Sequence, residues 1–273
     1  MPELPDVEVF RETLDATALH RRIRHAAVDA PRRMLAGVSE RALRRALEGH
    51  ELTATERHGK YLFAHVGRGE GQPWLLLHFG MSGSLEPRPS EAKDHIRLRL
   101  DLAGGRSLAY RSVRTLGKIG LVRSPASFVE TKRLGPDALA RDLDLDAFRS
   151  ALAGRRGPIK STLMNQRVLA GVGNLYADEI LFQARVDPRT PTAALGDRAT
   201  AAIFRAMRRV LSRAIAAHAE RFPRSFLLAH RDRGGACPRC GAKIRRITVS
   251  GRTTYFCPVD QRGAFHHPPP SAT

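Results

Sequence analysis

The chain begins Met1-Pro2-Glu3-Leu4-Pro5-Asp6-Val7-Glu8. An initiator methionine is normally removed when a small residue follows it, so the mature chain is expected to begin at Pro2. Its secondary amine would then lie beside the carboxylate of Glu3, and such an amine can attack a carbon at the aldehyde oxidation level to form an imine. Pro5 and Asp6 suit the first turn of a helix. These residues alone also fit a plain helix start without chemistry.

The next residues predict a helix followed by short strands. Apolar side chains recur at helical spacing in residues 7–14. Residues 61–66 and 74–79 are apolar enough for buried strands, whereas residues 95–100 alternate between apolar and basic side chains. A helix is expected at residues 39–49. Short strands at this spacing favour a β-sandwich over alternating α/β units.

The pattern changes near residue 131, where helical periodicity replaces the strand pattern. Helices are predicted at about residues 159–169, 175–185 and 198–218. The chain is therefore predicted to be a multidomain α+β protein. Its predicted domains are a strand-rich domain at 1–130, a linker at 131–150, a helical domain at 151–230, a cysteine-bearing unit at 231–267 and a tail at 268–273.

Length and composition exclude several classes of protein. The 273 residues are enough for two modest domains, and a hydrophobic content of 42% excludes wholesale disorder. The longest apolar runs fall far short of a membrane span, and the acidic start lacks the order of a signal peptide. Three cysteines, two of them in Cys-x-x-Cys, favour a metal site over disulfides. We expect a cytoplasmic protein without membrane contact.

The net charge points to a polyanionic partner. The chain carries a formal charge of +19 and has a sequence pI of about 11.2. Residues 151–273 hold 21 Lys and Arg against 7 Asp and Glu, so most of the excess lies in the second half. Such a distribution is typical of nucleic-acid binding, with the second half as the main electrostatic contact.

The cysteines are spaced as in a zinc site. Cys237-x-x-Cys240 is followed after sixteen residues by Cys257-x-x-Asp260. Two such pairs indicate one tetrahedral zinc ion, because each turn directs two side chains at the metal. Asp260 is the favoured fourth ligand, since zinc accepts carboxylates. Two alternatives remain open: a histidine at 266–267 takes the fourth place, or the site is vacant and packing holds the hairpin.

Two segments together resemble one family of DNA-repair enzymes. The octapeptide above is similar to the start of the formamidopyrimidine-DNA glycosylase and endonuclease VIII family, whose amino-terminal proline is the nucleophile. The second segment runs from Ile159-Lys160 through Gly171-Val172-Gly173-Asn174-Leu175-Tyr176-Ala177-Asp178-Glu179. It resembles that family's helix–two-turn–helix element. The resemblance implies that Asn174 binds backbone phosphate and that Lys160 lies near the lesion pocket.

Three shorter segments match the same family. His58-Gly59-Lys60-Tyr61-Leu62 resembles the segment whose lysine contacts DNA phosphate at the active site, which implies that role for Lys60. In His78-Phe79-Gly80-Met81-Ser82-Gly83-Ser84-Leu85, Met81 matches a methionine that fills the space left by an extruded base, and a flexible apolar side chain suits that role. Gly251-Arg252-Thr253-Thr254-Tyr255-Phe256-Cys257-Pro258 resembles the zinc-finger hairpin, in which Arg252 would bind phosphate.

One segment departs from the family pattern. The family carries an Arg-Arg-Phe-Gly string that supplies two more void-filling residues, and this chain reads Ser112-Val113-Arg114-Thr115-Leu116-Gly117. Arg114 keeps the arginine that contacts the orphaned base. Leu116 replaces the aromatic wedge, although an aliphatic wedge can still unstack a base step. The departure puts the usual preference for lesion and partner base in doubt.

The resemblance covers nearly the whole chain and implies a fold and an activity. The fold would be an N-terminal β-sandwich with flanking helices, a helix–two-turn–helix domain and a C-terminal zinc-finger hairpin. The activity would be that of a bifunctional DNA glycosylase and apurinic/apyrimidinic lyase on oxidised bases of the 8-oxoguanine and formamidopyrimidine type. Pro2 would form the Schiff base, Glu3 would carry protons, and β,δ-elimination would follow.

The resemblance also implies the cofactor and the partner. Structural zinc is expected, without a redox cofactor. The expected partner is damaged double-stranded DNA, bound by a monomer in the prokaryotic cytosol or nucleoid.

Two alternatives stay open at this point. An endonuclease VIII-like enzyme would share the chemistry but prefer oxidised pyrimidines; Leu4 after Glu3 favours the formamidopyrimidine branch. A non-catalytic paralogue would bind damaged DNA without cutting it. The intact Pro2-Glu3 pair argues against that paralogue, whereas retention of Met1 would favour it.

Overall fold

The computed structural model describes residues 1–69, 71–88, 95–220, 222–231 and 235–261. The chain forms two compact units, Met1–Arg133 and Leu134–Thr273. In the second unit, α4 (Leu145–Leu152) packs against α7 (Asp197–Ala216).

The first unit is the predicted β-sandwich. One sheet has the order β1-β7-β8-β6 and the other β2-β9-β5-β4-β3, and all pairs are antiparallel except β2 with β9. The strands are β1 (Ile23–Val28), β2 (Leu35–Ala36), β3 (Leu52–His58), β4 (Tyr61–Val66), β5 (Trp74–His78), β6 (Gly83–Pro87), β7 (Ile96–Leu102), β8 (Ser107–Ser112) and β9 (Lys118–Val122). Inward-facing side chains of both sheets form one core, as the alternation in β7 predicts.

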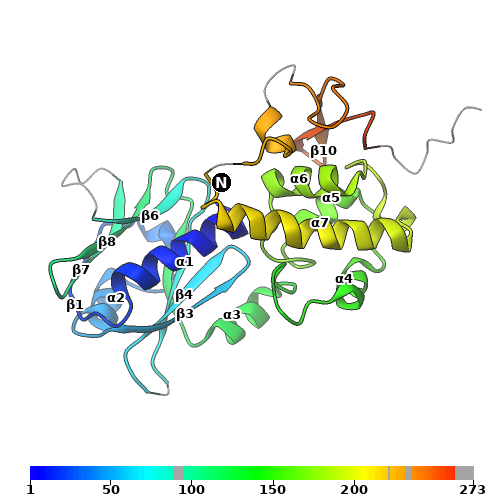
Figure 1. The fold of residues 1–273 in the computed structure, drawn as a ribbon. Helices are drawn as coiled ribbons and strands as arrows, with labels where there is room; N and C mark the ends of the chain where they lie inside the picture. Colours follow the sequence, from blue (N-terminus) through cyan, green and yellow to red (C-terminus); the bar gives the residue numbers. More distant parts are fainter. Residues whose placement is uncertain (70, 89–94, 221, 232–234, 262–273) are drawn as a thin grey trace, which may run out of the picture. The chain divides into compact units, whose positions relative to one another are not determined.

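Three helices and a 3-10 turn accompany these sheets: α1 (Leu4–Ala18), η1 (Arg32–Met34), α2 (Glu40–Leu47) and α3 (Pro125–Lys132). The first of them, α1, lies against β3, β4, β6 and β8 (Figure 1). Its apolar face is buried at Val7 and Leu14, as its helical spacing predicts. This packing places the amino terminus of the chain against the sandwich.

Polar contacts fix α1 to β3. Arg57 Nε donates to Glu8 Oε2 at 2.6 Å, and Thr55 Oγ1 donates to Asp15 Oδ1 at 2.6 Å. Burial acts to raise the pKa of Glu8, but hydrogen bonds from Arg11 and Arg57 hold it below its ordinary value. The ionised Glu8 therefore links α1 to the edge strand of the five-stranded sheet.

Two loops at the ends of β5 and β8 are in direct contact because both carry glycine. A Cβ added at Gly80 would lie 2.6 Å from the backbone nitrogen of Gly117. A Cβ at Gly117 would overlap the Tyr110 hydroxyl and lie 2.5 Å from the carbonyl oxygen of His78. The Tyr110 hydroxyl donates to that same carbonyl oxygen at 3.2 Å. These glycines bring the loops that carry Met81 and Leu116 together.

The second unit is built around α6 (Asn174–Ala184), which is buried along most of its length. It packs against α5 (Ile159–Met164), α7, η3 (Leu227–His230) and the hairpin strand β11 (Arg252–Phe256). That strand pairs in antiparallel fashion with β10 (Arg245–Val249), and η2 (Thr192–Ala194) precedes α7. The apolar face predicted for α7 is buried, and its arginines lie on the other faces.

Helix α5 is shorter than the sequence predicts, ending at Met164 instead of continuing to about residue 169. The side chain of Gln166 donates to the carbonyl oxygens of Met164 and Val172, each at 2.8 Å, and accepts from the amide of Gly171 at 3.0 Å. These bonds stabilise a compact turn in place of the last helical turn. None of the helices in the described part of the chain is long and apolar enough to cross a membrane.

We predict that Gly117→Ala destabilises the first unit. The added methyl group has to displace either Tyr110 or the backbone of β5, and such overpacking costs about 1–3 kcal/mol. Thermal or urea unfolding measures the loss. Gly157→Ala is the matched control, because its Cβ would meet only Ser161 Oγ at 3.6 Å. Equal stability of Gly117→Ala and the wild type would contradict the close contact between the loops.

Candidate functional site

The amino terminus lies at the start of α1, where the predicted nucleophile and acid are adjacent. Glu3 is the N-cap of this helix and is 1% exposed, whereas Met1 is exposed. The Glu3 amide donates to Asp6 Oδ2 at 2.8 Å, which forms half of a capping box. The half-buried Pro2 thus directly precedes a buried acid at the start of α1, and the catalytic roles of both stay predictions.

Lys60 belongs to the same electrostatic environment. It follows Gly59, whose φ of +57° forms the tight turn between β3 and β4. Burial raises the pKa of Asp6, while the positive charges of the amino terminus and Lys60 oppose that shift. The structure therefore groups Lys60 with the amino terminus, although the two are almost sixty residues apart in the sequence.

His78, at the end of β5, completes this group as a neutral side chain. Burial, reinforced by the charges of Lys60 and Lys118, lowers its pKa to about 4. Its ring lies 4.8 Å from the ring of Tyr61. At neutral pH His78 therefore adds no positive charge to this group.

Exposed apolar side chains mark the two contacting loops. Among the described residues of the first unit, the exposed large hydrophobic side chains besides Met1 are Met81 (43%), Val113 (55%) and Leu116 (47%). Arg114 is exposed in the same loop, and its amide donates to Ser82 Oγ at 3.2 Å. The structure thus brings together the predicted residues Met81, Arg114 and Leu116. It adds Val113, which sequence analysis missed because a lone valine carries no motif.

Arg33 is a second residue that sequence analysis missed. Its guanidinium donates to Thr115 Oγ1, and its carbonyl oxygen accepts from Lys118 Nζ at 2.5 Å. Thr115 has a φ of +51°, a backbone conformation that β-branched residues rarely adopt. Arg33 therefore stabilises a strained loop and contributes a cation where the family string carries its second arginine. No local pattern links positions 33 and 115.

Lys160 is buried in the second unit rather than exposed. Its Nζ lies 2.8 Å from Asp178 Oδ1, with both side chains at most 1% exposed. It also donates to Thr254 Oγ1 at 2.7 Å and to the carbonyl oxygen of Thr253 at 3.0 Å. Lys160 consequently joins α5, α6 and β11. The predicted proximity to a lesion stays a prediction, and the observed contacts position the strand that begins with Arg252.

The second oxygen of Asp178 extends this network. It accepts from the Tyr255 amide at 3.1 Å and from Arg231 Nη2 at 3.3 Å. The Arg231 guanidinium also lies over the Tyr255 ring, 4.6 Å from its centroid. Burial raises the pKa of Asp178, although Lys160 and Arg231 act in the opposite direction. Two cations therefore compensate this interior carboxylate.

Asn174 is the first residue of α6, directly after the N-cap Gly173. Its Oδ1 is buried and lacks a hydrogen-bond partner among the described residues. The preceding turn is braced by Gln166, so the position of Asn174 is fixed by the backbone. This placement suits the predicted phosphate contact, since helix N-termini favour anions.

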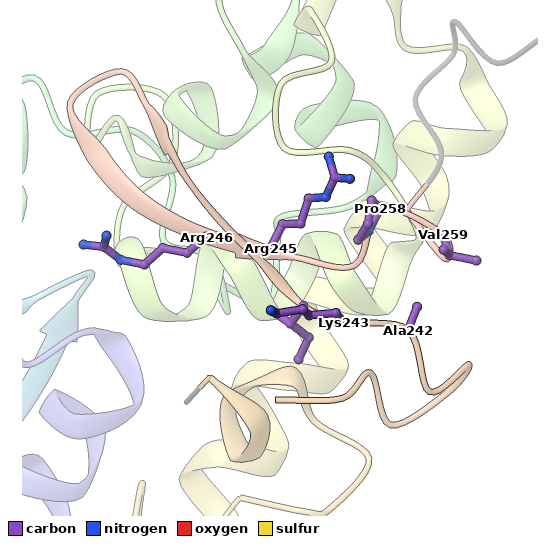
Figure 2. A pocket seen from close by; sticks show the side chains of 7 residues that line it. Ala242, Lys243, Arg245, Arg246, Pro258 and Val259 are labelled. Carbon is purple, nitrogen blue, oxygen red and sulfur yellow. The ribbon is translucent and has the colours of Figure 1, made fainter. Parts of the chain in front are cut away.

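The hairpin presents Arg252 at its tip. Ser250 and Gly251 have φ values of +46° and +74°, and Val249 pairs with Arg252 across this two-residue turn. Arg252 is exposed. Farther along, a hollow beside β10 is lined by Lys243, Arg245 and Arg246 together with Ala242, Ile244, Pro258 and Val259; Figure 2 shows Arg245 and Arg246 extending in different directions. The hairpin is therefore basic over much of its length.

Three cysteines form the metal site. The sulfur atoms of Cys237, Cys240 and Cys257 lie within 4.8 Å of one another, and no other described residue joins the group. Three converging thiols fit zinc, which binds thiolates tetrahedrally. The Asp260 carboxylate is paired with Arg239 at 2.8 Å. The alternative ligands at 266–267 lie outside the described residues.

Family models match the chain in three consecutive segments. Residues 1–119 match the formamidopyrimidine-DNA glycosylase N-terminal domain, residues 134–223 match the formamidopyrimidine-DNA glycosylase H2TH domain, and residues 234–263 match a zinc finger found in FPG and IleRS. The formamidopyrimidine-DNA glycosylase of Laribacter hongkongensis is 36% identical over 280 residues, covering 96% of this chain and all of that protein. This chain belongs to the formamidopyrimidine-DNA glycosylase family. The enzyme of the same name from Moorella thermoacetica is also 36% identical, over 265 residues that cover 90% of this chain and 94% of that protein.

Solved structures of formamidopyrimidine-DNA glycosylase share the fold. The Lactococcus lactis protein in complex with abasic-site DNA has a TM-score of 0.84 at 30% identity, covering 96% of this chain and all of that one. The same protein with Fapy-dG DNA gives a TM-score of 0.85 at 29% identity, over 95% of this chain and all of that one. The family assignment and the three converging cysteines agree on a structural zinc.

We predict that His78 makes stability depend on pH. Its pKa is about 4 in the folded chain against an ordinary value of 6.5, so between these values the unfolded chain binds a proton that the folded chain excludes. Stability should therefore rise with pH across this window. The slope of the unfolding free energy against pH is proportional to the number of protons taken up on unfolding. In His78→Gln this number should fall by up to about one.

Denaturant unfolding at several pH values measures these slopes. His50→Gln, the same substitution at an exposed position, is the control. Identical slopes for the wild type and His78→Gln would show that His78 has the same pKa in the folded and the unfolded chain, which would contradict the prediction.

Proposed function

We propose that this protein is a bifunctional DNA glycosylase and apurinic/apyrimidinic lyase that removes oxidised purines from duplex DNA. The observation that carries the proposal is the Pro2-Glu3 pair at the start of α1, with Glu3 buried and Lys60 in the same electrostatic environment. The relatives named formamidopyrimidine-DNA glycosylase and the Lactococcus lactis complexes with Fapy-dG and abasic DNA support the substrate class. We further infer that the enzyme acts as a monomer in the prokaryotic cytosol, where its substrate lies.

The first chemical step uses the secondary amine of Pro2 once Met1 has been removed. The damaged nucleotide leaves the base stack, because its sugar carbon is otherwise inaccessible. The amine attacks C1′, the glycosidic bond breaks, and the base leaves with the bonding electron pair and acquires a proton. Glu3 protonates the ring oxygen as the sugar opens, which yields an iminium ion between C1′ and the Pro2 nitrogen.

Elimination then cuts the strand. The iminium ion acidifies the hydrogen on C2′, and loss of that proton expels the phosphate on the 3′ side. A second elimination expels the phosphate on the 5′ side and leaves a gap of one nucleotide. Hydrolysis releases the sugar remnant and regenerates the amine. The sequence thus consists of a substitution at C1′, ring opening to the iminium ion, two eliminations of phosphate, a hydrolysis and the accompanying proton transfers.

Other residues hold the DNA and the vacated space. In the first unit, Lys60 would contact backbone phosphate, while Met81 and Leu116 would fill the gap left by the extruded nucleotide and Arg114 would contact the orphaned base. In the second unit, exposed Arg252 and the start of α6 at Asn174 would bind phosphate. Lys160, buried beneath β11, would act by positioning Arg252. Zinc, when bound, holds the hairpin together.

Borohydride trapping tests the covalent step. Reduction of the iminium ion on a duplex carrying 8-oxoguanine should leave a stable adduct on Pro2, which mass spectrometry of the amino-terminal peptide locates. Pro2→Gly should lower the yield strongly. Glu3→Gln should slow strand cleavage by about 10²–10⁴-fold, the usual contribution of a positioned proton carrier.

Thymine glycol duplexes, run in parallel, distinguish a pyrimidine-directed enzyme from the proposed one. The mass spectrum also reports whether Met1 is removed. No adduct on any substrate, with Met1 removed and DNA binding intact, would contradict the enzymatic proposal and leave a damage-binding protein.

A second prediction concerns the aliphatic wedge. Leu116→Ala should slow excision of 8-oxoguanine more than cleavage at a preformed abasic site, since a stacked base costs more to extrude than a missing one. Val113→Ala should produce a smaller change of the same kind, because Val113 is exposed on the same loop. Single-turnover rates of each variant and the wild type measure the loss of rate on 8-oxoguanine and the loss of rate at the abasic site, and the two losses are then compared.

Val259→Ala is the matched control, because Val259 is an exposed valine on the zinc hairpin rather than on this loop. An equal loss on both substrates for Leu116→Ala would indicate a general defect and would contradict the wedge role.

A further inference from the structure

Asp260 occupies the position where the spacing of the cysteines would place a fourth metal ligand, but its carboxylate is engaged elsewhere. Oδ2 accepts from Arg239 Nη1 at 2.8 Å, and Oδ1 lies 3.5 Å from Arg185 Nε. The Asp260 side chain is 9% exposed. Both oxygens thus face guanidinium groups rather than the cysteine sulfurs, and a partly buried pair of this kind is worth more than an exposed one.

Arg239 is held on its other side by α6. Its Nη2 donates to the carbonyl oxygen of Phe182 at 2.6 Å, and its guanidinium lies 3.9 Å from the centroid of the Phe182 ring. Arg239 stands between Cys237 and Cys240 in the first Cys-x-x-Cys turn. One arginine therefore connects the first cysteine turn, the second turn at Asp260 and helix α6.

The backbone around Asp260 is also satisfied. The Asp260 amide donates to Cys257 Sγ at 3.4 Å. The buried side chain of Gln261 accepts from the Cys257 amide at 2.8 Å and donates to the carbonyl oxygen of Val186 at 2.9 Å. The end of the hairpin is thus attached to the residues that follow α6 by contacts that need no metal.

We propose that Asp260 anchors the zinc hairpin to α6 through Arg239. Among the residues that the structure describes, only the three cysteines then bind zinc. To bind zinc, Asp260 would have to bring an oxygen to about 2.0–2.2 Å from the metal and give up its charged hydrogen bond to Arg239. Leaving the guanidinium of Arg239 without a carboxylate beside Phe182 opposes that change. The ion pair thereby replaces one metal–ligand bond as the link between the second cysteine turn and the rest of the unit.

The ligand count can be read directly from the metal. The zinc-loaded full-length wild type and its Asp260→Ala variant should give the same number of sulfur ligands by X-ray absorption. With cobalt in place of zinc, their thiolate charge-transfer bands should agree, and their zinc affinities should agree within about threefold. Asp260→Cys should add a fourth sulfur and raise zinc affinity at least tenfold. A tenfold or greater loss of zinc affinity in Asp260→Ala, or a changed cobalt spectrum, would overturn the proposal.

A double-mutant cycle tests the ion pair. Asp260→Ala and Arg239→Met should each lower the melting temperature of the zinc-loaded protein, and the double variant should lose clearly less than the sum of the two. Asp142→Ala, at an exposed aspartate of the same unit, is the control and should not couple to Arg239→Met. Additive losses for the Asp260 and Arg239 variants would contradict the anchor. Should Asp260→Ala fail to fold, Asp260→Asn keeps the side-chain shape and provides the same comparisons.

Discussion

The second unit depends on satisfying one buried positive charge. An ammonium group taken out of water costs several kcal/mol unless it is paired and hydrogen-bonded, and Lys160 obtains its partners from two other elements, Asp178 on α6 and the start of β11. Asp178 in turn requires Arg231 and the Tyr255 amide. Helix α6 and the hairpin are therefore constrained to one register. Removing one partner of such a pair typically costs about 3–5 kcal/mol, because the other charge is left buried.

In the first unit the corresponding constraint lies at the amino terminus, where an accessible amine is adjacent to an acid that is buried. The start of α1 provides both, since Glu3 caps the helix and is buried while the preceding residues remain accessible. His78 is kept neutral at pH 7 by burial, which lowers its pKa to about 4. These features suit a nucleophile that attacks a sugar in an anionic polymer.

At its departures from the family pattern, the chain makes contacts that the local sequence does not indicate. Thr115 and Leu116 stand where the family string carries a second arginine and a phenylalanine. Arg33 donates a hydrogen bond to Thr115, and Val113 is exposed on the same loop as Leu116. Asp260 stands in the place of a fourth metal ligand, and Arg239 takes up its charge. In each case the departure is visible in the sequence, whereas the partner of the replacing residue is not. The partners of Thr115 and Asp260 lie 82 and 21 residues away, and no local pattern joins them.

The sequence by itself predicted the strands at residues 61–66, 74–79 and 95–100, the amphipathic face of α7 and the three metal-binding cysteines, because periodicity and spacing are local properties. It also marked Pro2 and Glu3 through their adjacency. Only the tertiary structure decided that α5 ends at Met164, where Gln166 braces the turn, and that Lys160 is buried. The physical reason is that burial and pairing depend on which elements pack together. From the sequence alone a lysine is expected at the surface. It can be buried only when packing places a carboxylate beside it, and the sequence does not show that partner.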